Sequence, residues 1–161
     1  MLWRANLRLR LDDEELRDSL LAVAGNLDLS LYGPPSPLTD SNRRRTIYGY
    51  VGRTKPDSML ALFDFPNPNT MSEQRTITVG PLQRLYFLNN DFVLQQAKVF
   101  GDRLDAGSDE RKIAQAYRLL FGRQPAKSEI KLGLDFLRQS GGAWTQYAQA
   151  LFSSCEFSSV N

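Results

Sequence analysis

The strongest constraint on the fold is a helical spacing of apolar residues near the C-terminus. Two segments repeat apolar side chains at positions i, i+3, i+4, i+7 and i+8. The first set is Ile113, Ala116, Tyr117, Leu120 and Phe121, and the second is Trp144, Tyr147, Ala148, Leu151 and Phe152. This spacing places each set on one face of a helix. Each helix must bury that face, which favours a mainly α-helical fold.

Other segments carry the start and stop signals of helices. Asp12 followed by Glu15 is a capping-box pattern and Gly25 is a left-handed stop, so we expect a helix between them. Asp57 and Ser58 can start a short helix that the later prolines end. Further helices are expected over 82–89, 91–104, 108–121, 125–137 and 144–152. Because short loops join these later helices, the sequence predicts an antiparallel bundle.

The middle of the chain lacks helical spacing. Thr46–Val51 is rich in β-branched and aromatic residues and predicts a short strand, as does Thr76–Val79. Asn26–Tyr32 alternates apolar and polar side chains and is also strand-like. The predicted fold class is therefore mainly α, a multi-helix bundle with a short irregular β and loop segment at about 45–80.

Length and composition exclude several classes of function. The 161 residues suit one helical domain, 1–161, in which 108–161 could form a C-terminal helical subdomain. The chain has no histidine, which excludes Ser-His-Asp and Cys-His catalytic sets. Its one cysteine, Cys155, cannot form an internal disulfide and has apolar sequence neighbours, so we expect a buried structural thiol. No apolar run is long enough to predict membrane insertion, and the first residues do not form a secretory signal.

The candidate ligand-binding residues lie in the irregular middle. Arg43, Arg44 and Arg45 could bind a polyanion, or they could pair with carboxylates and carbonyls of their own chain. The net charge of only +2 favours internal pairing. Tyr48 and Tyr50, with Trp3, could form a sugar-stacking platform, since alternate residues of a strand share a face, or they could pack in a core or an interface.

Carboxylates and amides follow in the same region. Asp57 and Asp64 could be the paired carboxylates of a glycosidase, although a helix cap and a turn explain them more simply. Asp64, Asn67 and Asn69 could supply oxygen ligands to calcium, but their spacing is not that of an EF-hand. The sequence therefore predicts no catalytic residues, no metal ligands and no cofactor.

Several segments carry motifs in a fixed order along the chain. They are Leu16–Gly25, Arg43–Tyr48, Phe63–Asn69, Leu88–Val93, Gly122–Glu129 and the ending Ser154–Phe157. Arg75, Thr78 and Gln83 approximately match a further pattern, Arg-x-x-Thr-x-x-x-Gln. Taken in order, these motifs resemble a family of large planctomycete proteins, the domain of unknown function 1553. The resemblance covers nearly the whole chain.

The resemblance implies a helical, extracytoplasmic domain at the C-terminal end of a longer protein. It implies no established activity, substrate or catalytic residue. Some relatives carry haem, but this chain lacks the residues for covalent haem attachment. Separately, Ile113–Phe157 is similar to a helical module of bacterial surface proteins, which favours a role in binding.

From these observations we expect a structural or interaction domain without a catalytic site of its own. The expected partners are upstream domains of a parent protein or a surface partner, and no nucleic acid is expected. The first alternative is a carbohydrate-binding or carbohydrate-active domain that uses Tyr48, Tyr50, Asp64 and the three arginines Arg43–Arg45. The second alternative is polyanion binding through Arg43–Arg45.

Overall fold

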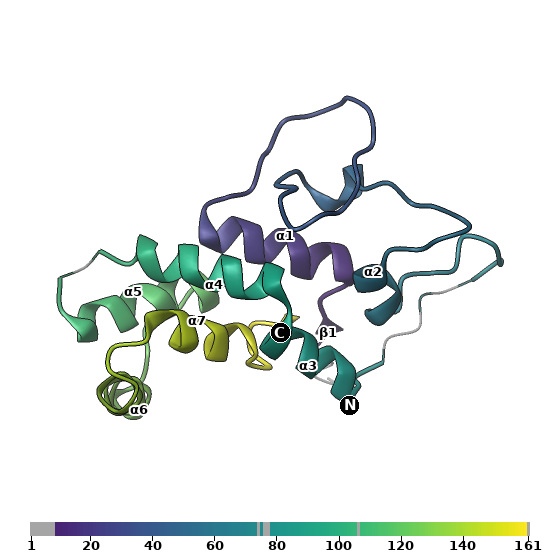
Figure 1. Cartoon of the computed structure of the whole chain (residues 1–161). Helices are drawn as coiled ribbons and strands as arrows, with labels where there is room; N and C mark the ends of the chain where they lie inside the picture. Colours follow the sequence, from purple (N-terminus) through teal and green to yellow (C-terminus); the bar gives the residue numbers. More distant parts are fainter. Residues whose placement is uncertain (1–8, 74, 76–77, 106, 161) are drawn as a thin grey trace, which may run out of the picture.

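The computed structural model describes residues 9–73, 75, 78–105 and 107–160, and this part of the chain is mainly α-helical (Figure 1). Its seven helices are α1 (Asp13–Ala24), α2 (Ser58–Leu62), α3 (Pro81–Asn89), α4 (Asp91–Arg103), α5 (Asp109–Phe121), α6 (Lys127–Gln139) and α7 (Trp144–Phe152). A 3-10 turn, η1, covers Thr46–Tyr48, and the short strands β1 and β2 cover Leu9–Arg10 and Ser159–Val160.

Helices α4 and α7 form the centre of the bundle. They make the most extensive helix pair, and α1 packs along α4 (Figure 1). Helix α3 contacts both α4 and α7. Helices α5 and α6 lie at the end of the molecule that is far from α2 (Figure 1). Figure 1 shows α6 along its axis, so this helix crosses α7 at a steep angle. The helical fold class predicted from the apolar spacing is therefore confirmed.

The buried apolar residues form one continuous core. Leu20 of α1, Val93 and Phe100 of α4, and Phe152 of α7 are inaccessible to solvent. The rings of Phe100 and Phe152 pack with their centroids 5.5 Å apart. Burying such side chains contributes about 1.5–3 kcal/mol each. The core thus joins the first helix to the last.

The predicted helix ends agree with the structure. Asp57 caps α2 by accepting hydrogen bonds from the backbone N–H groups of Met59 and Leu60. Gly25 and Gly122 follow α1 and α5 with φ angles of 79° and 67°, as left-handed stops require. Both glycines can adopt this conformation because they lack a Cβ atom.

Two of the three strand predictions are wrong. Thr46–Val51 begins with η1, because Asp18 binds the backbone N–H and the hydroxyl of Thr46, each at 2.7 Å. Asn26–Tyr32 forms only an isolated bridge between Asp28 and Arg44. The third prediction, Thr76–Val79, includes residues 76 and 77, which lie outside the described residues.

The two strands of the structure, β1 and β2, carry no sequence pattern that predicts them. Strands β1 and β2 are antiparallel, with Leu9 opposite Val160 and Arg10 opposite Ser159. Each strand has two residues, too few for an alternating pattern to be recognised.

A glycine on α6 allows close packing between the last three helices. A Cβ atom at Gly133 would lie 2.6 Å from the hydroxyl of Tyr147 and 2.8 Å from Cδ1 of Ile113. At Gly101 on α4, the nearest atom would be Cβ of Trp144, at 3.4 Å, an ordinary contact.

We predict that Gly133→Ala lowers the free energy of unfolding by about 1–3 kcal/mol, because the methyl group overpacks the α5–α6–α7 contact. The matched variant Gly101→Ala should raise it by about 0.5 kcal/mol, since alanine restricts the unfolded chain. Urea unfolding followed by circular dichroism measures both. Equal effects of the two variants would contradict the packing argument.

Candidate functional site

The central lobe, residues 26–57, arches over α1 (Figure 1). It contains little regular structure beyond η1 and two isolated bridges, Asp28 with Arg44 and Ser36 with Gly49. A long irregular segment needs other contacts to hold one conformation. Those contacts come from two adjacent residues of α1, Arg17 and Asp18.

Arg17 is a buried arginine that binds the lobe from below. Its side chain is 2% exposed. The guanidinium donates to the carbonyl oxygens of Asn42 at 2.6 Å and Arg44 at 3.2 Å, and to the hydroxyl of Thr46 at 3.2 Å. It also stacks over the ring of Phe92 on α4, 5.1 Å from the centroid. Burial lowers the pKa of Arg17, and its hydrogen bonds offset the cost of removing the charge from water.

The role of Arg17 was not predicted from the sequence, although its spacing from apolar residues of α1 indicates a buried position. Arg17 lies three, four and seven residues before Leu20, Leu21 and Ala24, all of which are buried. An arginine at that spacing falls on the apolar face of the helix. Because buried charges require partners, this position predicts a hydrogen-bonded anchor.

The three predicted arginines contact their own chain. Arg44 donates to the carbonyl oxygen of Pro34 at 3.0 Å and stacks 4.3 Å above the ring of Tyr48. Arg43 donates to Gln95 of α4 at 3.1 Å. Arg45 lies 3.5 Å from the carboxylate of Asp18 and is about half exposed. These contacts agree with internal pairing, while polyanion binding stays an untested prediction.

The two predicted tyrosines differ in their surroundings. The hydroxyl of Tyr48 accepts a hydrogen bond from the backbone N–H of Tyr32, and Arg44 covers its ring. Tyr50 lies beyond η1 and is 61% exposed. The strand that would align their rings is absent, because Tyr48 belongs to η1. The geometry expected for a stacking platform is therefore not formed by this pair, and Trp3, its third expected member, lies outside the described residues.

Asp64 and the two asparagines belong to separate networks. Asp64 pairs with Arg10 at 3.1 Å and accepts hydrogen bonds from Thr78. The side-chain oxygen of Asn67 accepts from the backbone N–H of Asn69, and the Asn69 amide donates to the carbonyl of Arg53. The described residues contain no cluster of three His, Cys, Asp or Glu placed to hold a metal ion.

A small cavity lies beside the asparagines. It has a volume of about 300 Å³ and is lined by Val51, Arg53, Pro56, Asp57, Leu60, Ala61, Phe65, Pro66, Asn67, Pro68 and Asn69. Asp64 is not among these lining residues, and Asp57 is occupied as the cap of α2. The proposed carboxylate pair therefore does not share this cavity.

A larger groove, the α1 groove, runs between α1 and the central lobe. Its volume is about 560 Å³. Its apolar lining residues are Leu11, Ala22, Leu27 and Ile47, and its polar ones are Glu14, Glu15, Asp18, Ser19 and Arg45. Arg75 pairs with Glu14 and Arg45 pairs with Asp18, so Glu15 is the lining carboxylate that has no ion-pair partner among the described residues. Because apolar residues line the groove with this carboxylate, it can accept an apolar side chain that is accompanied by a basic one.

An acidic cluster at the start of α1 was also missed. Arg75 binds Glu14 at 2.7 Å and Asp12 at 3.1 Å, and lies 3.5 Å from Asp13. Asp13 is 1% exposed, and burial together with the adjacent Glu14 raises the pKa of its carboxyl well above the usual range. Hydrogen bonding to Arg75 lowers the pKa of Glu14. Only the fold brings Arg75 to these carboxyls, since it is about sixty residues away in the chain.

The expectation for Cys155 is wrong, because the structure places this thiol at the surface. Helix α7 ends at Phe152, and the chain then turns, so that Phe157 enters the core while Cys155 faces outward. The apolar neighbours in the sequence did not reveal this turn. Cys155 instead receives a hydrogen bond from Arg84 of α3 at 3.0 Å.

The fold and the site together define a mainly α-helical protein whose irregular central lobe is fixed by a buried arginine. A family model described as PSD1, protein of unknown function (DUF1553), matches residues 1–137. The chain therefore belongs to the DUF1553 family. No curated protein and no solved structure matches the chain.

In the part of the chain that the structure describes, no helix is long and apolar enough to cross a membrane.

We predict that Arg17→Met lowers the free energy of unfolding by about 3 kcal/mol, because the carbonyl oxygens of Asn42 and Arg44 lose their buried donor. The central lobe should also become more sensitive to proteolysis. Arg138→Met is the matched control, since that side chain is 76% exposed and forms an exposed ion pair with Asp135. It should change stability by less than about 0.5 kcal/mol. Equal losses in the two variants would contradict the anchoring role of Arg17.

We predict that the free energy of unfolding of Asp13→Asn, measured relative to that of the unaltered chain, increases as the pH rises above about 4. The folded chain keeps Asp13 protonated while the unfolded chain releases the proton, so the folded state binds more protons and loses stability as pH rises. The variant cannot lose that proton. Urea unfolding across this pH range measures the difference. A difference that is constant, or that falls with pH, would show that Asp13 is ionised in the fold.

Proposed function

We propose that this chain is a non-catalytic interaction domain that binds a partner segment carrying apolar and basic side chains along the α1 groove. The observation that carries this proposal is the exposure of Ile47, which is 72% exposed at the edge of the groove, on a lobe that Arg17 and Asp18 fix in place. The partner is an upstream domain of a longer parent protein or a separate surface protein. The family resemblance favours an extracytoplasmic setting.

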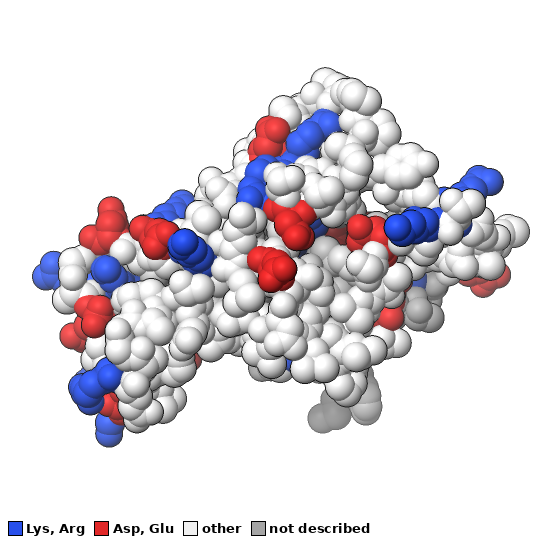
Figure 2. Space-filling model, in the orientation of Figure 1, with Lys and Arg blue, Asp and Glu red and all other residues white. Residues whose placement is uncertain are grey.

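Exposed apolar side chains are concentrated on the central lobe. They are Leu29 (68% exposed), Leu31 (63%), Tyr32 (83%), Ile47 (72%), Tyr50 (61%) and Val51 (44%). Hydrogen bonds connect the two arms of the lobe, since Tyr32 donates to Tyr48 and Ser36 donates to the carbonyl of Tyr48. Figure 2 shows the upper part of the molecule, where the lobe lies, as mostly uncharged surface. Of these six residues, Ile47 lines the α1 groove, and exposed apolar side chains that gather on one part of a protein are typical of interaction surfaces.

The central lobe is held in one conformation, and this favours a role of its exposed residues in binding. A loop that is already held in one conformation loses little conformational entropy when a partner binds. The contacts of Arg17, Asp18 and Arg44 order the lobe in the absence of a partner. The binding residues are thus presented by a fixed scaffold, as in other loop-based recognition sites.

The charge of the groove specifies the chemistry of the partner. Glu15 is exposed, whereas Glu14 and Asp18 are already paired with Arg75 and Arg45. Arg45 is the one basic residue in its lining. A partner segment with Lys or Arg beside a large apolar residue complements both features.

Selection from a random peptide library tests the proposal. We expect the selected peptides to combine apolar and basic residues, and Ile47→Asp to weaken their binding about tenfold or more, as for the loss of one apolar anchor. Leu132→Asp is the matched control, because Leu132 is 70% exposed on α6, away from the groove. It should leave binding unchanged, and calorimetry measures both affinities.

Two results would contradict the proposal. One is a set of selected peptides whose binding depends on Leu132 and not on Ile47. The other is a hydrolase activity of the purified chain that Asp64→Asn abolishes, which would favour the carbohydrate-active alternative.

A further inference from the structure

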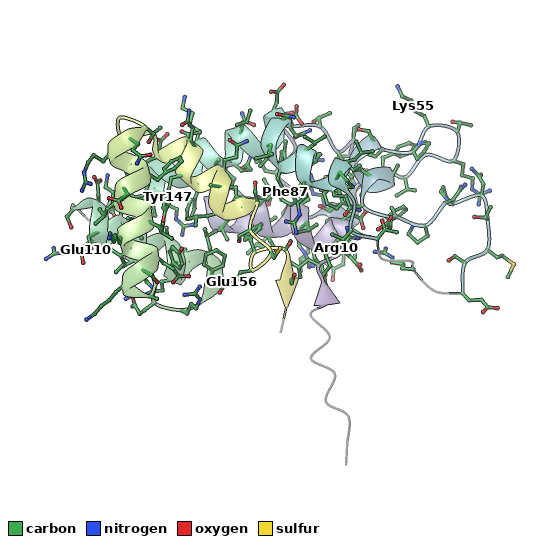
Figure 3. All side chains as sticks on the ribbon, turned by 90° about the horizontal axis from the view of Figure 1, so that it is seen from below. Arg10, Lys55, Phe87, Glu110, Tyr147 and Glu156 are labelled. Atoms are coloured by element: carbon green, nitrogen blue, oxygen red, sulfur yellow. The ribbon has the colours of Figure 1, made fainter. Side chains whose placement is uncertain are left out.

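We propose that a second cavity, between β1, α3 and the C-terminal segment, binds a carboxylate that carries a short apolar group. This Arg10–Arg84 cavity has a volume of about 260 Å³. It is lined by Arg10, Leu16, Phe63, Val79, Gln83, Arg84, Phe87, Cys155, Ser158 and Ser159. Two of these lining residues, Arg10 at β1 and Phe87 on α3, are labelled in Figure 3.

Arg10 is a nearly buried, positively charged lining residue of this cavity. Its side chain is 10% exposed. Nη2 donates to the carbonyl of Phe63 at 3.3 Å and to Asp64 at 3.1 Å. Nε and Nη1 are closed to solvent and have no hydrogen-bond partner among the residues that the structure describes. Arg10 therefore contributes a positive charge beside the cavity, and that charge is paired with Asp64.

Arg84 supplies the charge that a ligand would balance. Its guanidinium donates to the carbonyl of Ser153 at 2.9 Å and to Sγ of Cys155 at 3.0 Å. Within the described ranges it has no carboxylate partner, whereas Arg10 is paired with Asp64. Arg10, Arg84 and Asp64 together carry one net positive charge. A ligand with one negative charge would balance it, and a carboxylate fits the planar geometry of a guanidinium.

The walls of the cavity identify the rest of the ligand. Leu16, Phe63, Val79 and Phe87 are apolar and lie beside the two arginines. An inorganic phosphate would carry excess charge and would leave these walls without a partner, whereas an apolar group would bury them. A free short-chain acid and the C-terminal residue of a peptide share this chemistry.

The cavity is independent of the proposed interaction surface. Its lining residues include none of those that line the α1 groove. It also lies outside the central lobe. Failure of one proposal therefore leaves the other intact.

Cys155 provides a site-specific test, because it is the only cysteine of the chain, is exposed and lines the cavity. We expect 4-methylpentanoate to slow alkylation of Cys155 by neutral iodoacetamide. The slowing should be about tenfold at about ten times the dissociation constant, since only the unoccupied fraction reacts. The uncharged analogue 4-methylpentanamide should not protect.

Two variants test whether protection of Cys155 depends on this cavity or on a general effect of the acid on the protein. Arg84→Gln should abolish protection, measured as the ratio of alkylation rates with and without the acid, because the uncompensated charge is removed. Arg84 is partly exposed, so this change is milder for folding than one at Arg10. Arg138→Gln, on the exposed face of α6, is the matched control and should keep full protection.

A peptide ending in leucine with a free carboxylate distinguishes the two sources. Protection by this peptide at lower concentration than by the free acid assigns the site to a chain terminus, and the reverse assigns it to a small metabolite. Equal protection by inorganic phosphate or by the amide overturns the proposal. Protection that persists in Arg84→Gln, or no protection by either carboxylate, also overturns it.

Discussion

The structure depends on one buried guanidinium, that of Arg17. Placing a charge in a core is unfavourable unless acceptors surround it, and here two backbone carbonyls, one hydroxyl and an aromatic ring do so. The same contacts satisfy carbonyl groups of a lobe that has no sheet or helix to receive them. The interaction thereby joins α1, the central lobe and α4 into one unit, and the shape of the α1 groove follows from it.

The helices were predictable because their signals are local. Apolar spacing, caps such as Asp57 and stops such as Gly122 act within a few residues, and the structure places helices where these signals occur. The strand prediction at Thr46–Val51 failed for the opposite reason. Its backbone is fixed by Asp18, twenty-eight residues earlier, and a contact of that range overrides the local β preference.

The sites were less predictable, because they are assembled from distant segments. The sequence identified Arg43–Arg45 as basic, but only the fold shows that their partners are carbonyls, Gln95 and Asp18. The Arg10–Arg84 cavity combines β1, α3 and the residues after α7, which share no motif. Arg17 is the exception, since its position on the apolar face of α1 was readable.

The pairing of β1 with β2 has a topological consequence. Leu9 lies opposite Val160, so the described chain is almost a closed ring. Linking these two strands covalently would cost the folded state little, because the fold already holds them together, while it would lower the entropy of the unfolded chain. A circular permutant opened in an exposed part of the lobe would therefore keep the helical core and release one arm of the lobe from the other. Such a permutant would separate the contribution of the lobe to stability from that of the helical core.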